Sequence, residues 1–313
     1  MNLIHIGLPK TASTTLQDRL FSKQERFLYL GRIQNGYSDA RIKELLERVA
    51  FQDSLEYDAR AAESLVASLR ASDAPRTRPI IVSAESLSVE GRTDRRLIAE
   101  RLHKLFAPAK VLIVLRAQPA MLQSLYLNDL RGSGQPLWPF DVWLERLYGG
   151  IRYTEMHRIA LNYEPLVRLY DDVFGQENVT VLAFEQIKDA SSPVFDRLAG
   201  LVQVDRAEVS ACFAVSKNQR MSRRHMLAMR VQGHLPAGTN LAHFGRRVLP
   251  EIMYRPIRSF VVSGRRMASP TFSAEWCRRI ASACAAGNSR IAVRKSLPLE
   301  SLGYPIIESQ SAS

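Results

Sequence analysis

Four short apolar runs, rich in β-branched residues, constrain the fold of this chain more than any other feature. The runs are NLIHIG, PIIVS, KVLIVL and NVTVLAF, which begin at residues 2, 79, 110 and 178. Segments with helical periodicity separate them. Continuous apolar strands are typical of a parallel sheet that helices cover on both faces. We therefore predict an α/β fold of three layers, with right-handed crossovers between the strands.

The helices expected between these strands follow from periodicity and from capping residues. The first is expected to start at a hydroxyl N-cap, and Pro119 suits the first turn of a later one. The expected helices span residues 13–21, 39–50, 58–71, 94–106, 118–130, 155–174, 193–202 and 274–293. A chain of 313 residues is compatible with one domain, here with a core over about residues 1–205 and 270–313.

Lysine and arginine dominate the segment 217–266, which holds eleven of them against one acid, Glu251. We predict a basic helical insertion or C-terminal subdomain here, which carries most of the net charge of +12. Such a charge favours an anionic partner, which can be a nucleotide, an acidic glycan, nucleic acid or a membrane surface. Apolar and basic residues interleave over 244–267, so contact with a membrane surface stays open. The segment lacks the aromatic or zinc patterns that favour nucleic acid.

Cysteine usage and the N-terminal sequence bear on the compartment. Cys212, Cys277 and Cys284 form neither a disulfide framework nor a CxxC metal pair, so free thiols in a reducing cytoplasm are expected. The first residues lack the basic start and long apolar stretch of a signal peptide. No run approaches the ~20 apolar residues of a membrane span. We expect a cytoplasmic protein without a metal, and the oligomeric state stays open.

The stretch HIGLPKTASTTLQ, which starts at His5, places one cation and four hydroxyl groups between the first strand and the first helix. Backbone N–H groups and the helix dipole favour an anion at such a turn, and Lys10 adds a full positive charge. The stretch lacks the Gly-Lys-Ser/Thr of a Walker A loop. It indicates a phosphate or sulfate site, with a simple helix cap beside an exposed lysine as the alternative. The hydroxyl residues are Thr11, Ser13, Thr14 and Thr15.

This stretch resembles the 5′-phosphosulfate loop of sulfotransferases, in which proline and lysine precede small hydroxyl residues. The residues that match the family pattern are Pro9, Lys10, Thr11, Ser13 and Thr14. Ala12 departs from it, because the family usually has glycine there. If that position needs a positive φ, alanine is strained.

A second segment, VLRAQPAMLQSLY, resembles the 3′-phosphate site of the same family. Arg116 follows the strongest strand, and Ser124 stands eight residues later, which is the spacing of the family's arginine and serine. A guanidinium fork suits a dianionic phosphate. Two weaker similarities extend the match: residues 169–187 resemble the family's later helix–strand unit, and residues 285–305 resemble the C-terminal end of bacterial carbohydrate-type members.

The resemblance implies a P-loop-NTPase-like parallel sheet and a sulfuryl transfer from 3′-phosphoadenosine 5′-phosphosulfate (PAPS), with 3′-phosphoadenosine 5′-phosphate (PAP) as product and no metal. The implied acceptor is a hydroxyl or amine of a carbohydrate or related molecule. Lys10 would stabilise the leaving phosphate, and Glu85, just after the second strand, would be the general base. The implied cofactor-binding residues are Lys10, Thr11, Ala12, Ser13, Thr14, Thr15, Arg116 and Ser124, and Lys217 and Arg220 are further candidates.

Other interpretations stay open at the level of sequence. His103 and His157 are rival bases that sit in helical patterns, and His5 is expected to be buried. Glu185 ends a strand and is expected to be structural. A P-loop kinase is one rival function, although it would require Gly-Lys-Ser/Thr and a strand-end aspartate. A catalytically inactive basic protein that binds membrane or nucleic acid is the other. Tyr126 and Trp138 are candidates for lining a pocket or the core.

Overall fold

The computed structural model describes most of the chain outside its basic segment. The described residues are 1–34, 36–73, 75, 77–88, 94–132, 138–149, 161–189, 191–214, 222–227, 253, 255–256, 259–260 and 269–307. The segment 217–266 falls mostly outside them. The helical insertion expected there therefore stays a prediction, and so does the single-domain division.

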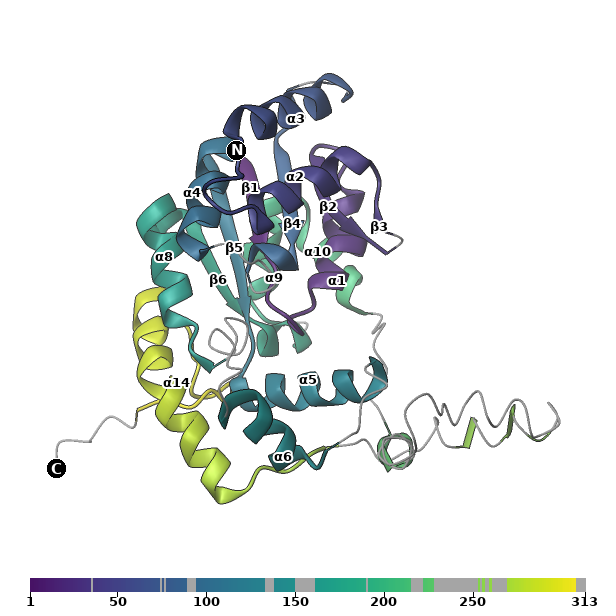
Figure 1. Cartoon of the computed structure of the whole chain (residues 1–313), viewed down its shortest axis with the longest axis vertical. Helices are drawn as coiled ribbons and strands as arrows, with labels where there is room; N and C mark the ends of the chain where they lie inside the picture. The colour runs from purple at the N-terminus through teal and green to yellow at the C-terminus, as the bar shows by residue number, and fades with distance from the viewer. Residues whose placement is uncertain are drawn as a thin grey trace.

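A six-stranded sheet in the order β3-β2-β4-β1-β5-β6 forms the centre of the molecule (Figure 1). Neighbouring strands are parallel except β2 and β3, which are antiparallel. The four predicted strands, β1, β4, β5 and β6, are confirmed and are parallel to their neighbours, as predicted. The unpredicted strand β3 adds one antiparallel pair at the edge. Only two residues separate β2 from β3, which permits only an antiparallel pair. The strands are β1 (Asn2–Ile6), β2 (Leu28–Ile33), β3 (Gly36–Tyr37), β4 (Ile80–Ala84), β5 (Ala109–Leu115) and β6 (Val179–Ala183).

The predicted helices are found, with three differences. The first is only a short α-helix that continues as a π-helix, the predicted helix 155–174 is interrupted at Asn162 and Tyr163, so that α8 begins only at Glu164, and α6 and α10 were not predicted. The α-helices are α1 (Ser13–Thr15), α2 (Ala40–Phe51), α3 (Ala59–Ala71), α4 (Arg95–Phe106), α5 (Gln118–Gly132), α6 (Phe140–Leu144), α8 (Glu164–Phe174), α9 (Val194–Val202), α10 (Arg206–Ala214) and α14 (Ala274–Lys295). The π-helix η1 spans Leu16–Leu20, and the 3-10 turns include η2 (Phe21–Lys23), η3 (Glu85–Leu87), η5 (Gln176–Asn178) and η6 (Phe184–Lys188).

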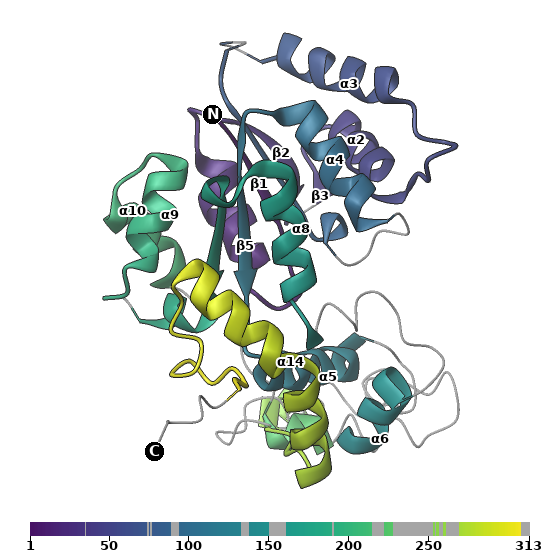
Figure 2. The same cartoon turned by 90° about the vertical axis from the view of Figure 1, so that its left-hand side faces the viewer.

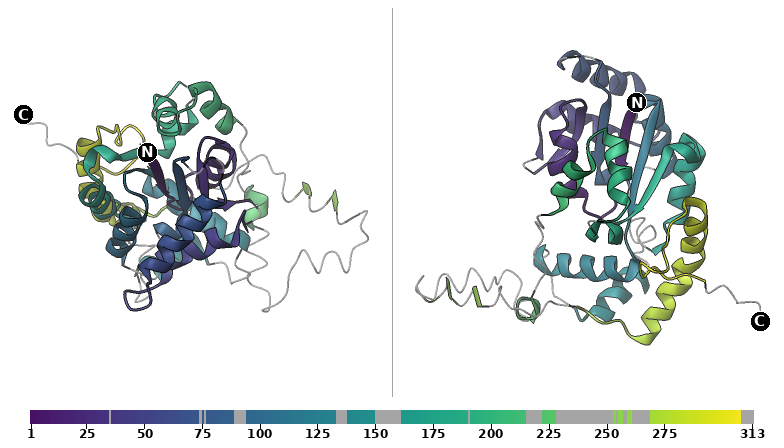
Figure 3. Two further views of the ribbon diagram at one scale, coloured as in Figure 1. Left: turned by 90° about the horizontal axis from the view of Figure 1, so that it is seen from above. Right: turned by 180° about the vertical axis from the view of Figure 1, so that it is seen from behind.

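Helices cover both faces of the sheet, which confirms the three layers. On one face the strands pack with α2, α4 and α8, and on the other with η1, α9 and α10. Figure 3 shows α9 and α10 on the opposite side of the sheet from α2 and α4. Successive residues of β1 serve different cores, because Leu3 packs on the second face and Ile4 on the first. Burial on both faces explains why these strands read as continuous apolar runs.

A third group of helices lies beyond the carboxyl ends of the strands. Figures 1 and 2 show α5, α6 and the first half of α14 there. Their shared core includes Tyr126, Phe140, Trp143 and Trp276. Tyr126 is 1% exposed and its hydroxyl donates to the carbonyl of Trp138 at 2.9 Å, so it belongs to this core and not to a pocket wall. These helices therefore lie opposite the carboxyl edge of the sheet.

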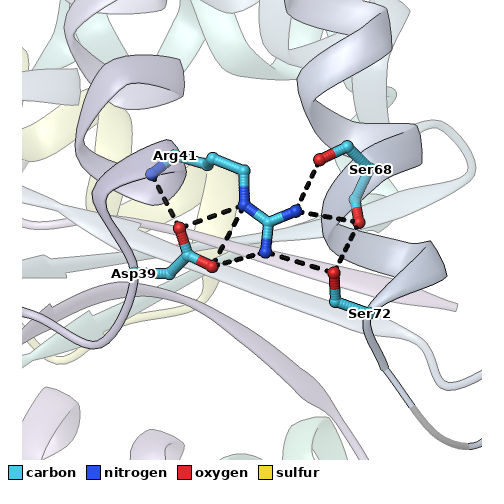
Figure 4. Close-up of polar contacts among 4 residues, drawn as sticks. All are labelled: Asp39, Arg41, Ser68 and Ser72. Atoms are coloured by element: carbon cyan, nitrogen blue, oxygen red, sulfur yellow. Dashed lines mark hydrogen bonds and ion pairs between the residues drawn. The ribbon is translucent and has the colours of Figure 1, made fainter.

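Arg41 links α2 to α3 through hydrogen bonds (Figure 4). Asp39 is the N-cap of α2 and accepts from the backbone N–H of Arg41 at 2.8 Å. The guanidinium of Arg41 binds the Asp39 carboxylate at 2.6 Å and the hydroxyl of Ser68 on α3 at 2.6 Å. It also bonds Ser72, the C-cap of α3, at 3.1 Å. One side chain therefore satisfies groups at the start of α2 and the end of α3.

Candidate active site

Three neighbouring strands, β4, β1 and β5, end at the same edge of the sheet. Ile6 pairs with Ala84 of β4 and with Ile113 of β5. The loop after β1, Glu85 and Arg116 therefore emerge side by side. Ligands of open parallel sheets bind outside the carboxyl ends of the strands. All three segments directly follow strands that the sequence predicted.

The loop after β1 contains two non-glycine residues in the left-handed region. Lys10 has φ 63° and Ala12 has φ 65°. Ala12 is the N-cap of α1 and provides no side-chain cap, so the prediction of a hydroxyl N-cap is wrong. Its carbonyl accepts from the N–H groups of Thr15 at 2.9 Å and Leu16 at 3.0 Å. Left-handed backbone costs about 1–2 kcal/mol for a residue with a Cβ, so this loop stores strain of the kind found at functional sites.

The hydroxyl groups of the loop divide into two pairs. Thr11 and Ser13 are buried, and both donate to the carbonyl of Leu8, at 2.7 and 3.1 Å. Thr14 is exposed and Thr15 is half-buried. The first pair stabilises the loop from its buried side, whereas the second pair is at least partly exposed to solvent.

Arg116 lies directly beside this loop. Its Nη1 donates to the carbonyl of Lys10 at 2.8 Å, across 106 positions of sequence. The guanidinium lies 4.8 Å from the centre of the Phe184 ring, and Tyr163 donates its hydroxyl to the Arg116 carbonyl at 2.8 Å. Backbone and side chain of Arg116 are therefore both held in place. The structure brings the two predicted phosphate motifs together.

Glu185 stabilises the segment between β5 and α5, which contains Arg116. One carboxylate oxygen accepts from the backbone N–H of Ala117, which precedes α5, at 3.2 Å, and the other accepts from the hydroxyl of Tyr304 at 3.0 Å. Burial raises the pKa of Tyr304 well above its usual range, and the nearby Glu185 carboxylate adds to this. Glu185 is therefore structural, as predicted. Sequence reasoning did not single out Tyr163 or Tyr304, although Tyr304 lies in the segment 285–305 that resembles the family.

Glu85 lies against the start of the loop. A Cβ added to Gly7 would lie 3.3 Å from Cγ of Glu85 and 3.0 Å from Oγ of Ser13. Gly7 thus allows these two side chains to approach the backbone closely. Ser88, at the end of the same 3-10 turn, donates its hydroxyl to the Gly7 carbonyl. This contact fixes the turn that carries Glu85 against the loop, three residues before Lys10.

Helix α5 contributes residues that sequence reasoning missed. Nζ of Lys10 donates to Oδ1 of Asn128 at 3.0 Å, and Asn128 stands one helical turn after Ser124. The carboxylate of Asp129 accepts from Nε1 of Trp143 at 3.1 Å. Burial raises the pKa of Asp129, while the Trp143 hydrogen bond and the charge of Lys10 act in the opposite direction. The four-residue spacing from Ser124 was the available signal for Asn128.

Of the candidate histidines, His5 and His103 lie among the described residues and have other partners. His5 is buried, as predicted, and its Nδ1 lies 2.7 Å from Oγ of Ser83. Burial lowers the pKa of His5 to about 3. His103 packs edge-on against Phe174, with 5.2 Å between the ring centres. His157 lies outside the described residues.

The remaining candidate site residues lie partly inside and partly outside the described residues. Lys217 and Arg220 lie outside the described residues, so their roles stay predictions. Trp138 is half-buried, with the guanidinium of Arg146 3.7 Å from its ring centre.

The three cysteines are unpaired. The described parts of the chain contain no group of three or more His, Cys, Asp or Glu residues arranged to hold a metal ion. Among the described helices, none is long and apolar enough to cross a membrane.

The comparisons with known proteins gave matches only among solved structures. No family model and no curated protein matches the chain. The chain is similar to a sulfotransferase from Alicyclobacillus acidocaldarius, at 18% identity and a TM-score of 0.46, over 81% of this chain and 98% of that one. It is also similar to the sulfotransferase domain from the curacin biosynthetic pathway, at 14% identity and a TM-score of 0.38, over 90% and 96%. At these values neither likeness carries an argument about function.

Proposed function

We propose that this chain is a sulfotransferase that uses PAPS as the sulfuryl donor. The observation that carries the proposal is the 2.8 Å hydrogen bond from Arg116 to the Lys10 carbonyl. It joins two separate motifs, each suited to a phosphate, at the end of adjacent parallel strands. A nucleotide with a phosphosulfate at one end and a 3′-phosphate nearby needs two such cationic sites a short distance apart.

The residues of the site fit this donor. Lys10 and Ala12 have left-handed backbone, the kind of strain found at functional sites, and the side chain of Lys10 reaches Asn128 of α5. Arg116 lies beside the loop, and Ser124 is one helical turn before Asn128. Bound PAPS would supply a sulfuryl group on a good leaving phosphate. Lys10 would hold that phosphate oxygen as its negative charge grows.

Glu85 is proposed as the general base that takes the proton from the acceptor. It lies at the end of β4, beside Gly7 at the start of the loop. A base at this place contributes about 10²–10⁴-fold to a rate. The acceptor is proposed to be a hydroxyl or amine of a carbohydrate or related molecule. The basic segment 217–266 would bind an acidic acceptor or an anionic surface.

Calorimetric titration with PAP in the presence of EDTA tests the donor site. We expect wild-type protein to bind with micromolar affinity, which corresponds to about −8 kcal/mol. Lys10→Ala and Arg116→Ala should each weaken binding by about ten- to a hundredfold, the scale of a charged hydrogen bond. Lys110→Ala is the matched control, because Lys110 is exposed and lies at the opposite, amino end of β5.

The outcomes distinguish the rival functions. Binding of ATP that requires Mg²⁺, without binding of PAP, would favour a kinase. Binding of anionic vesicles or DNA with a steep salt dependence, again without PAP, would favour an inactive basic protein. Folded wild-type protein that binds none of these would refute the proposed donor site.

A further inference from the structure

Helix α5 carries two adjacent polar residues in the region of Lys10. The first is Asn128, whose Oδ1 accepts from Nζ of Lys10 at 3.0 Å. Lys10 is on the loop after β1, whereas Asn128 is 118 positions away on the helix that crosses the carboxyl edge of the sheet. The ammonium group is therefore held toward α5 before any ligand arrives.

The second residue is Asp129, which is half-buried next to Asn128. Its Oδ2 accepts from Nε1 of Trp143 at 3.1 Å, and Trp143 is 7% exposed in the core between α5, α6 and α14. This bond anchors the carboxylate to a rigid element. Burial raises the pKa of Asp129, and the positive charge of Lys10 acts in the opposite direction. Because Asp129 directly follows Asn128, it places a carboxylate close to the residue that binds the ammonium group of Lys10.

We propose that Asn128 and Asp129 are positioning residues for Lys10, which hold its ammonium group at the loop and partly offset its charge. This inference rests on the proposed function for its purpose, although the contacts exist without a ligand. An incoming phosphate has to compete with Asn128 and Asp129 for the ammonium group. The donor affinity is then set by α5 as well as by the loop.

The rate at which an amine reagent labels Lys10 in the ligand-free protein tests whether α5 holds its ammonium group. In Asn128→Ala and in Asp129→Asn, Lys10 loses a group that stabilises its protonated form, so more of it is the reactive free amine. We expect an acylating reagent, followed by peptide mass spectrometry, to label Lys10 about threefold faster than in wild type, the scale of a partly exposed ion pair. Lys110 in the same molecules is the internal reference. Asp129→Asn keeps an acceptor for the indole N–H of Trp143, so the core contact survives.

Titration with PAP tests the effect on the donor. Removal of the negative charge in Asp129→Asn should tighten PAP binding by about threefold or more, because the phosphates lose a repelling neighbour. Asp141→Asn is the matched control, since it removes an exposed acid from α6 and should leave the affinity unchanged. A purely structural Asp129 would change neither the labelling rate nor the affinity.

The results separate this inference from the proposed function. Unchanged Lys10 labelling in both variants, or unchanged PAP affinity in Asp129→Asn, would overturn the role of α5. If wild-type protein binds no PAP, the proposed donor site is refuted, and the labelling rates alone then decide whether Asn128 and Asp129 hold Lys10.

Discussion

Replacement of His5 by asparagine is expected to flatten the pH dependence of the stability of this protein. His5 lies in β1 beneath the loop, fully buried, with its ring 5.4 Å from that of Phe21. Nδ1 pairs with Oγ of Ser83, which also accepts from Gln17 at 3.1 Å. Nε2 has no hydrogen-bond partner among the described residues. A proton added to this ring would carry a buried charge without a counter-ion, which is the reason for its lowered pKa.

The magnitude follows from linkage between protonation and folding. The pKa of His5 falls from 6.5 to about 3 on burial. Between these values the unfolded chain binds a proton that the folded protein excludes, so the unfolding free energy falls as the pH falls. Each pH unit in this window is worth about 1.4 kcal/mol. At about pH 5 the protein should therefore have lost roughly 2 kcal/mol relative to about pH 7.5 through His5 alone.

Urea denaturation of wild type and His5→Asn at both pH values measures this contribution. Asparagine keeps an amide partner for Ser83 and has no group that titrates. The carboxylates of the protein titrate alike in both proteins, so the difference between the two pH dependences isolates His5. The reasoning would be refuted if both proteins lost the same free energy between about pH 7.5 and pH 5.

Three further substitutions test the structure by urea denaturation. Ala12→Gly should raise the unfolding free energy by about 1 kcal/mol because it relieves the left-handed alanine, and equal or lower stability would contradict the strain argued for the loop. Lys295→Met should cost about 3 kcal/mol, since the buried carboxylate of Asp171 loses the ammonium group 2.6 Å away and keeps only Arg294 at 3.4 Å, and adding Asp171→Asn should recover part of that loss. Arg101→Met should cost about 2 kcal/mol, because carbonyl groups at the end of α2 lose their donor, whereas a cost near zero would mean that water replaces it.

The strands could be predicted from the sequence where helices cover both of their faces. β1, β4, β5 and β6 appear as apolar runs, since both of their faces contact helices, and their bounds lie within about one residue of the prediction. β2 was missed. Its sequence LYLGRI mixes apolar, small and charged residues, because only its middle residues are buried.

The candidate site could be predicted only as separate pieces. Local spacing singled out Lys10 and Arg116. Neither motif shows that β1 and β5, the strands that precede them, are neighbours in the sheet. The contact of Lys10 with Asn128 depends on how α5 crosses the edge of the sheet. No local pattern encodes such a crossing, because it results from packing against α6 and α14.

The sequence alone determined the alternation of strands and helices, the positions of the two phosphate motifs and the burial of His5. These features follow from periodicity and residue chemistry within short windows. The tertiary structure alone decided the left-handed conformation of Ala12, the hydrogen bonds from Thr11 and Ser13 to the Leu8 carbonyl, and the contact of Lys10 with Asn128 of α5. Each of these depends on contacts between segments that only the folded chain brings together.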